Sequence, residues 1–241
     1  YLSKNFIYKF SPDLNKRTYT YIVRYLYNNK VPNIILPTDL YEEIQSSVNG
    51  NKMLLQKIPY KKHGDLFTYF TSNKLNYYEK YTIFYKIIKI IKDLHSLNIS
   101  HRDIKLENIL IDFSPNLELY LIDFDFSNNN NNYSTFNGGT VCYAAPELFN
   151  KNNKIKNFKC VDIWALGIIL NIIIFNKLPW SCANISCNYY NDYLRCPLYF
   201  NKQLSSLNIP SIHKNIYEKI FNYCFNTDYN TRINIDDILN L

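Results

Sequence analysis

The chain has 241 residues, of which 47% are apolar and 20% charged, a composition that suits a globular protein able to bury a core. Its 27 Lys and Arg residues outnumber its 20 Asp and Glu residues but are scattered along the chain. We therefore interpret the net charge of +7 as a basic surface and expect no nucleic-acid partner. No apolar run approaches the ~20 residues that a membrane helix needs, so we expect no membrane partner either.

The cysteines lack both the Cys-x-x-Cys spacing and the flanking histidines that would indicate a zinc site. We predict free thiols in a reducing compartment, which favours the cytoplasm without excluding the nucleus. The six residues are Cys142, Cys160, Cys182, Cys187, Cys196 and Cys224.

The first 60 residues predict a small β-rich unit with one helix. Strand-forming residues cover 5–10, apolar side chains at helical spacing cover 16–27, and Pro32 ends that helix. Two further strands are expected over 34–44 and 52–58, with a polar turn between them.

The rest of the chain predicts a mainly helical unit with a few short strands. A broad apolar stripe over 78–97 indicates a core-facing helix, and the almost wholly apolar stretch 161–175 indicates a helix buried on all sides. The other expected elements are a short helix over 66–70, strands over 109–112 and 119–122, and a helical tail over 212–241.

Several short motifs follow one another in this second unit. They are HRDIKLEN at residues 101–108, DFD at 123–125, APE at 145–147, and a D-x-W-x-x-G pattern at 162–167. Any one of these matches is weak, but all of them in this order and at these separations are specific. On these residues the chain resembles the protein kinase family over nearly its whole length.

The resemblance implies an α+β, two-lobe kinase fold, with a small β-rich lobe carrying one helix and a larger, mainly helical lobe. The kinase domain would cover residues 1–241, with a partial small lobe at 1–60 and the large lobe at 61–241. The implied reaction transfers the γ-phosphoryl group of ATP to hydroxyls of protein substrates, with Mg²⁺ as cofactor.

Phosphoryl transfer depends on positioning and charge neutralisation more than on covalent chemistry, and four motif residues fit those tasks. The resemblance makes Asp103 the carboxylate that orients the attacking hydroxyl, and Lys105 the cation beside the transferring phosphoryl group. Asn108 and Asp123 would supply oxygen ligands to Mg²⁺ and so hold the nucleotide. A single match could be an ordinary polar surface residue, but four matches together are not explained in that way.

The resemblance also indicates which hydroxyls are modified. Lys105, two places after Asp103, is typical of serine/threonine kinases, whereas tyrosine kinases usually carry a different sequence there. Gly139 and Thr140 resemble the substrate-docking loop of the serine/threonine group, in which the Thr140 hydroxyl would bond to Asp103 and Lys105.

Further residues are expected to support or regulate the site. Arg232 should pair with Glu147 as a structural ion pair. Arg102 indicates control by phosphorylation of the loop between Asp123 and Glu147, with Thr135 the favoured position. A disordered polar loop is an equal alternative. The residues that should hold the catalytic loop are His101, Phe124, Asp162 and Trp164.

The small lobe departs from the family pattern. No glycine precedes Gly50, and the chain begins with tyrosine rather than methionine, so we expect a fragment whose glycine-rich loop lay upstream. The first predicted strand resembles the family's lysine-bearing strand, which makes Lys9 the lysine that grips the nucleotide phosphates. An exposed strand lysine is the alternative. The hinge that binds adenine is expected near Ile58 and Tyr60.

The glutamate that should pair with Lys9 is also missing. Counting back from the proline that ends the helix, its place falls at Tyr21 or Ile22, and the chain has no Glu anywhere in that region. Asp13, a residue outside the chain, or no residue at all would then take its part. Asp125 replaces the usual Gly of its motif, which we interpret as mild because Asp tolerates left-handed backbone angles.

These patterns leave more than one function open. An active serine/threonine kinase is favoured because the base, the cation and both metal ligands are present. A pseudokinase, which keeps the fold as a binding or scaffold module, is favoured by the missing Glu and glycine loop. A small-molecule phosphotransferase would share the carboxylate chemistry but would not need the APE motif at 145–147.

Overall fold

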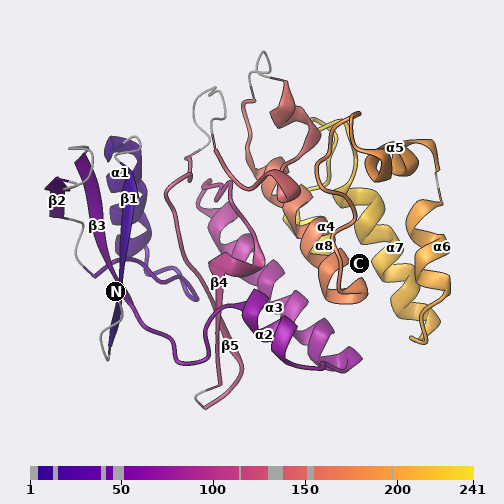
Figure 1. The fold of residues 1–241 in the computed structure, drawn as a ribbon, viewed down its shortest axis with the longest axis horizontal. Coiled ribbons are helices and arrows are strands. Elements are labelled where there is room, and N and C mark those ends of the chain that lie inside the picture. Colours follow the sequence, from indigo (N-terminus) through magenta and orange to yellow (C-terminus); the bar gives the residue numbers. More distant parts are fainter. Residues whose placement is uncertain are drawn as a thin grey trace.

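Two lobes of unequal size lie side by side in the computed structural model of the chain (Figure 1). The smaller lobe holds a sheet and one helix, and the larger lobe is mainly helical, so the predicted α+β architecture is confirmed. The structure describes residues 5–12, 16–38, 42–45, 52–113, 115–129, 138–150, 155–196 and 198–241.

The small lobe is built on a three-stranded antiparallel sheet. Its strands are β1 (Phe6–Pro12), β2 (Glu42–Gln45) and β3 (Lys52–Pro59), in the order β1-β3-β2. The register of β1 and β3 places Lys9 opposite Gln56. Because directly opposite residues point to the same face of a sheet, their side chains are neighbours.

The helix α1 (Lys16–Asn28) accompanies this sheet and agrees with the prediction. Its buried residues are Tyr19, Ile22, Val23 and Leu26, which recur at the three- and four-residue spacing of one helix face. That face joins the main apolar core, which extends into the large lobe.

The predicted strand over 34–44 is wrong in its first half. Among the described residues of this range, the strand β2 begins at Glu42, while Ile34 and Ile35 lie against the large lobe. There the N–H of Ile35 donates to the carbonyl of Leu121 at 3.0 Å, and the N–H of Leu121 donates to Asn33 at 2.9 Å. These apolar residues contact β5 instead of forming a strand of the small-lobe sheet, since a strand pattern does not specify its partner.

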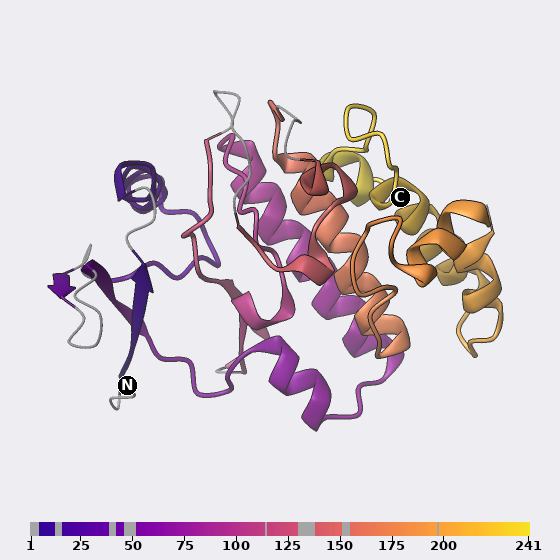
Figure 2. The same ribbon diagram turned by 45° about the horizontal axis from the view of Figure 1, so that its top comes forward.

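The large lobe surrounds two long helices, α3 and α4, that pack against each other (Figure 2). Asn76 and Glu79 form a capping box at the start of α3, satisfying two backbone N–H groups that no helical bond reaches. The helices are α2 (Leu66–Ser72), α3 (Tyr77–Ser96), α4 (Lys159–Phe175), α5 (Asn188–Arg195), α6 (Tyr199–Ser205), α7 (Ser211–Cys224) and α8 (Ile235–Leu239). The strands are β4 (Ile109–Asp112) and β5 (Glu118–Leu121), and the 3-10 turns are η1 (Leu106–Asn108), η2 (Val141–Tyr143) and η3 (Pro146–Phe149).

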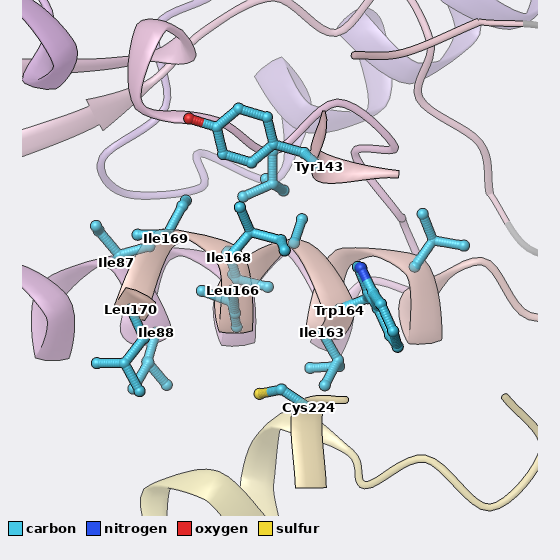
Figure 3. Close-up of a cluster of buried hydrophobic side chains, with 14 of the residues drawn as sticks. Ile87, Ile88, Tyr143, Ile163, Trp164, Leu166, Ile168, Ile169, Leu170 and Cys224 are labelled. Carbon is cyan, nitrogen blue, oxygen red and sulfur yellow. The ribbon is translucent and has the colours of Figure 1, made fainter. Parts of the chain in front are cut away.

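Helix α4 forms the centre of the large-lobe core, as its apolar sequence predicts. Figure 3 shows its isoleucine and leucine side chains between Ile87 and Ile88 of α3 and Cys224 of α7. Asp162 is fully buried within this helix, which requires hydrogen-bond partners for its carboxylate. No helix in the described part of the chain is both long and apolar enough to cross a membrane.

The tail was predicted only coarsely. It contains α7 and α8, separated by a loop, and the two short helices α5 and α6 before them were not predicted. The turns of α5 and α6 are stabilised by tertiary contacts, since Tyr193 and Phe200 pack on the buried ring of Trp180. A helix of only seven or eight residues is too short to be stable alone, so its sequence carries a weak signal.

Candidate active site

The catalytic loop, residues 101–108, is anchored by hydrogen bonds to the buried carboxylate of Asp162 on α4. Asp162 accepts hydrogen bonds from the backbone N–H groups of His101 and Arg102, each at 2.8 Å. The ring of His95 on α3 lies 2.9 Å from the same carboxylate. Arg102 has the left-handed φ of 70°, a backbone conformation that these bonds stabilise. The predicted scaffold role of Asp162 therefore has a direct structural basis.

His101 connects the catalytic loop to the loop that carries Asp123. Its Nδ1 accepts a hydrogen bond from the N–H of Asp103 at 3.3 Å, so its Nε2 is the nitrogen that donates to the carbonyl of Ile122 at 2.9 Å. The His101 ring also contacts the edge of Phe124, with ring centres 4.9 Å apart. Both loops are thus fixed relative to each other by one buried imidazole.

Asp103 lies at the centre of a closed set of hydrogen bonds. One carboxylate oxygen accepts from the Thr140 hydroxyl at 2.8 Å, and the other lies 2.9 Å from the Lys105 ammonium. Lys105 also donates to the Thr140 hydroxyl at 2.8 Å. The predicted contacts of Thr140 with both residues are confirmed. Asp103 is only 6% exposed, so the orientation of its carboxylate is set by these partners rather than by water.

Asn108 completes the catalytic loop, and its side-chain amide contacts Asp103. Its side-chain N–H group donates to the carbonyl and the carboxylate of Asp103, at 2.9 and 3.0 Å. The amide nitrogen is therefore committed, and the amide oxygen is the atom that can bind a cation. The carbonyl of Asn108 accepts from the N–H of Ile122 at 3.0 Å, which brings the loop before Asp123 beside it.

Asn108 and Asp123 fit a magnesium site that the nucleotide itself would complete. Within the described residues no three His, Cys, Asp or Glu side chains gather as a protein-only metal cage. Mg²⁺ is usually bound by one or two protein oxygens together with substrate phosphates, and it prefers hard ligands of this kind. One carboxylate and one amide oxygen are consistent with that arrangement.

Lys9 is not an exposed strand lysine, because its ammonium lies between two carboxylates of the large lobe. The distances are 2.6 Å to Asp123 and 2.8 Å to Asp125, and the Lys9 side chain is 29% exposed. Burial acts to lower the pKa of Lys9, but the two carboxylates outweigh it and the pKa lies above its usual value. Lys9 is therefore a charged residue that links the two lobes.

Neither of the two positions expected for the missing glutamate carries an acidic side chain. Ile22 is fully buried in the core and Tyr21 is 49% exposed, and without a carboxylate neither can form an ion pair with Lys9. Asp13 lies outside the described residues. Asp125 does not take the left-handed conformation that we expected it to tolerate, whereas its neighbour Asp123 does, with φ 68°. The replacement of glycine by Asp125 therefore leaves the backbone in an ordinary conformation and adds a side chain that contacts Lys9.

The expected hinge residues lie at the junction of the two lobes. Ile58 is 6% exposed and packs with Ile35 and Leu110, so its side chain forms part of the wall between the lobes. Tyr60 is 37% exposed, and its backbone N–H donates to the carbonyl of Asn5 at 2.9 Å. That N–H is used in a bond between the two segments that adjoin β3 and β1, and the adenine-binding role of Ile58 and Tyr60 stays a prediction.

The expected ion pair between Arg232 and Glu147 is present and buried. Its two hydrogen bonds are 2.7 and 2.9 Å long, and the side chains are 0% and 2% exposed. Arg232 also lies over the Trp164 ring at 4.9 Å and donates to the carbonyl of Cys160 at 2.8 Å. This pair connects η3, which contains Glu147, to the loop before α8, which contains Arg232.

The regulatory prediction falls partly outside the described residues, because Thr135 lies there. Arg102 is described: its guanidinium lies 4.2 Å over the Phe158 ring, and burial lowers its pKa to about 10, although Asp162 acts in the opposite direction. Control by phosphorylation through Arg102 stays a prediction.

Comparison with known proteins agrees with this geometry. Residues 7–241 match the family described as the protein kinase domain. Serine/threonine-protein kinase ppk16 of Schizosaccharomyces pombe is 32% identical over 215 residues, covering 87% of this chain and 29% of ppk16. Serine/threonine-protein kinase ppk6 of the same organism is 34% identical over 202 residues, covering 83% of this chain and 24% of ppk6.

A third relative is serine/threonine-protein kinase SIK1 of Rattus norvegicus, which is 34% identical over 158 residues, or 64% of this chain and 19% of SIK1. The chain therefore belongs to the protein kinase family. It spans less than a third of the length of each of these relatives.

Proposed function

We propose that this domain transfers the γ-phosphoryl group of Mg²⁺-ATP to serine and threonine hydroxyls of protein substrates. The observation that carries the proposal is the joint hydrogen bonding of Asp103, Lys105 and Thr140. The domain is assigned to residues 1–241, with the small lobe ending near residue 60. The reaction requires ATP and a protein, and neither nucleic acid nor a membrane. Six cysteines without a disulfide support a reducing, cytoplasmic setting.

Each of these side chains has a task in the proposed reaction. A serine or threonine hydroxyl entering beside Thr140 would donate a hydrogen bond to the Asp103 carboxylate, which orients it for attack. The ammonium of Lys105, 2.9 Å from Asp103, would offset negative charge on the transferred group. Asn108 fixes the Asp103 carboxylate through its amide N–H, so the base is preorganised before substrate arrives.

The metal and the nucleotide would be held by residues of both lobes. Mg²⁺ bound to the phosphates would neutralise part of their charge, and the Asn108 amide oxygen and the Asp123 carboxylate are the groups that would hold it. Lys9, which contacts Asp123 at 2.6 Å, would bind the phosphates from the small-lobe side.

The test is transfer of radiolabelled phosphate from Mg²⁺-ATP to generic acceptor proteins, followed by phosphoamino-acid analysis. Label should appear on serine and threonine, and it should disappear when Mg²⁺ is chelated or when Asp103 is replaced by Asn. Label found on tyrosine would contradict the assigned specificity, and a wild-type chain that transfers no label would contradict the activity.

A pseudokinase is the second candidate, and the lack of any acidic residue on α1, where the family has its glutamate, favours it. Such a module would bind nucleotide without turnover. Nucleotide at ~100 times its dissociation constant stabilises a folded protein by about 2.7 kcal/mol. For a domain of this size the melting temperature would then rise by roughly 5 to 10 °C. A shift of this kind without phosphate transfer would favour the second candidate.

A further inference from the structure

The helix of the small lobe offers Lys9 no carboxylate. In protein kinases an ion pair between the nucleotide-binding lysine and a helix glutamate must be in place for activity. Here the expected position on α1 is Tyr21 or Ile22, and α1 carries no Asp or Glu at any position. A helix without an acidic side chain cannot form this ion pair, so another element must supply the carboxylate that positions the lysine.

Asp125 supplies the missing carboxylate from the opposite lobe. One of its oxygens lies 2.8 Å from the Lys9 ammonium, and its side chain is only 10% exposed. Charge-assisted hydrogen bonds in such a partly dry site are stronger than surface ion pairs. Asp125 stands where the family motif has a glycine, which has no side chain to make this contact.

The second oxygen of Asp125 is fixed by the small lobe. The side-chain amide of Gln56, which is 2% exposed, donates to it at 2.9 Å. Gln56 is the direct cross-strand partner of Lys9 on the neighbouring strand β3. The Asp125 carboxylate is therefore held by two adjacent side chains of one sheet face, a lysine on one oxygen and an amide on the other.

We propose that Asp125 is the positioning residue for Lys9 in this chain, that it replaces the helix glutamate, and that Gln56 holds it in place. The inference rests on the proposed function because nucleotide phosphates are the ligand that Lys9 would bind. It assigns distinct tasks to the two acidic residues: Asp123 would hold the metal ion, whereas Asp125 keeps Lys9 in place. With Asp123 bound to Mg²⁺, Lys9 would still have the Asp125 carboxylate as its partner.

A direct test measures the protonation of Lys9 in the folded chain. Acetic anhydride acylates only unprotonated amines, and mass spectrometry gives the labelling rate of Lys9 relative to the exposed Lys30. Removing a neighbouring carboxylate lowers the pKa of Lys9, and each pKa unit lost raises the free-amine fraction about tenfold. Asp125→Asn should therefore label Lys9 several times faster than wild type, and Asp125→Glu should bring the rate back toward wild type.

The matched control is Asp236→Asn, which removes the carboxylate of the remote Lys92–Asp236 pair and should leave Lys9 labelling unchanged. Melting curves verify that every variant is folded. An unchanged Lys9 rate in folded Asp125→Asn would overturn the proposal. A faster rate in Asp125→Asn that Asp125→Glu does not reduce would also overturn it, because opening of the site would then be the cause.

A double-mutant cycle on nucleotide affinity then tests the positioning itself. Asp125→Asn should weaken Mg²⁺-ADP binding by about tenfold, the loss expected for one charge-assisted contact. In a Lys9→Met background, Asp125→Asn should have almost no further effect, because the residue acts through the lysine. Equal losses in both backgrounds would overturn the proposal. If wild type binds no nucleotide, the labelling rates alone decide.

These outcomes are separable from those of the proposed function. A chain that shows the expected labelling rates and binding cycle but transfers no phosphate would retain the Lys9–Asp125 assignment and lose the kinase activity. A chain that transfers phosphate but shows no dependence of Lys9 on Asp125 would retain the kinase activity and lose the Lys9–Asp125 assignment.

Discussion

The two lobes differ in how closely they follow the protein kinase pattern. In the large lobe, Asp103 is held by three side chains, and the loop around it is anchored on the buried Asp162. In the small lobe, the helix that should support Lys9 carries no acidic residue, and the contact comes from Asp125. The residues proposed to perform the chemistry thus lie in the lobe with the larger core. Binding a phosphate requires only a positioned positive charge, which more than one arrangement provides.

The largest effect should come from the large lobe. Asp103→Asn keeps the size of the side chain and its contact with Thr140, but removes the carboxylate that accepts the substrate proton. Loss of a general base typically costs about 10²–10⁴-fold in rate, so kcat should fall by that amount while nucleotide affinity stays nearly constant. Steady-state kinetics and nucleotide titration measure the two quantities separately.

The control is Asp236→Asn, which removes an exposed acidic group far from the site and should leave kcat unchanged. An Asp103→Asn enzyme that retains a tenth of the wild-type rate would contradict the assignment of the catalytic base to the large lobe, because catalysis would then not depend on this carboxylate.

The buried ion pair between Arg232 and Glu147 gives the largest expected effect on stability. Arg232→Met leaves the Glu147 carboxylate buried without its bidentate partner. Breaking a buried pair by removing one member costs about 3–5 kcal/mol of unfolding free energy. Urea unfolding followed by circular dichroism measures it. Asp236→Asn breaks a pair whose side chains are 46% and 63% exposed and should cost less than about 1 kcal/mol. Equal losses would show that burial is not the deciding factor.

A smaller effect is expected where two large-lobe helices come into close contact. A Cβ atom added at Gly167 would lie 2.7 Å from the Phe225 ring and 2.8 Å from Cβ of Cys224. Gly167→Ala should therefore force α4 and α7 apart, and overpacking of this kind costs about 1–3 kcal/mol. Thermal melting measures the loss.

The small lobe provides the comparison for that substitution. Arg24→Ala changes the exposed face of α1 and should alter stability by less than about 0.5 kcal/mol. If Gly167→Ala proved as mild as Arg24→Ala, the two helices would have room that the structure does not show.

The last effect is seen only at high pH. Burial raises the pKa of Tyr193 to about 12, and its hydroxyl donates to the carbonyl of Phe225 at 2.6 Å. Because the folded pKa exceeds the unfolded value of 10.0, the folded state retains this proton longer. Its contribution to stability is full below pH 10 and is lost as the pH rises toward 12.

Tyr193→Phe should be somewhat less stable than wild type at neutral pH, since one hydrogen bond is lost. Its stability should then fall less steeply between pH 10 and 12, as measured by urea unfolding at several pH values. An unchanged slope would mean that Tyr193 ionises as easily in the folded chain as in the unfolded one.

Much of the large-lobe site could be predicted from the sequence because its residues are close together in the chain. The stretch 101–108 contains Asp103, Lys105 and Asn108, and one loop conformation brings all three together. The Thr140 contacts were also predicted, from a resemblance that already includes the loop geometry. Helices α3 and α4 were predicted to within a residue or two because their apolar patterns are long.

The sequence by itself determined the family, the catalytic loop and the absence of a glutamate near Lys9. Only the tertiary structure decided what replaces that glutamate. Lys9 and Asp125 are separated by 116 residues, and Gln56 and Asp125 by 69, so no local pattern connects them. From the sequence, the replacement of the motif's glycine by Asp125 was explained by the tolerance of Asp for left-handed backbone angles. The side-chain contacts instead arise because the folded lobes bring a lysine, an amide and a carboxylate into one partly buried site, where each must have a partner.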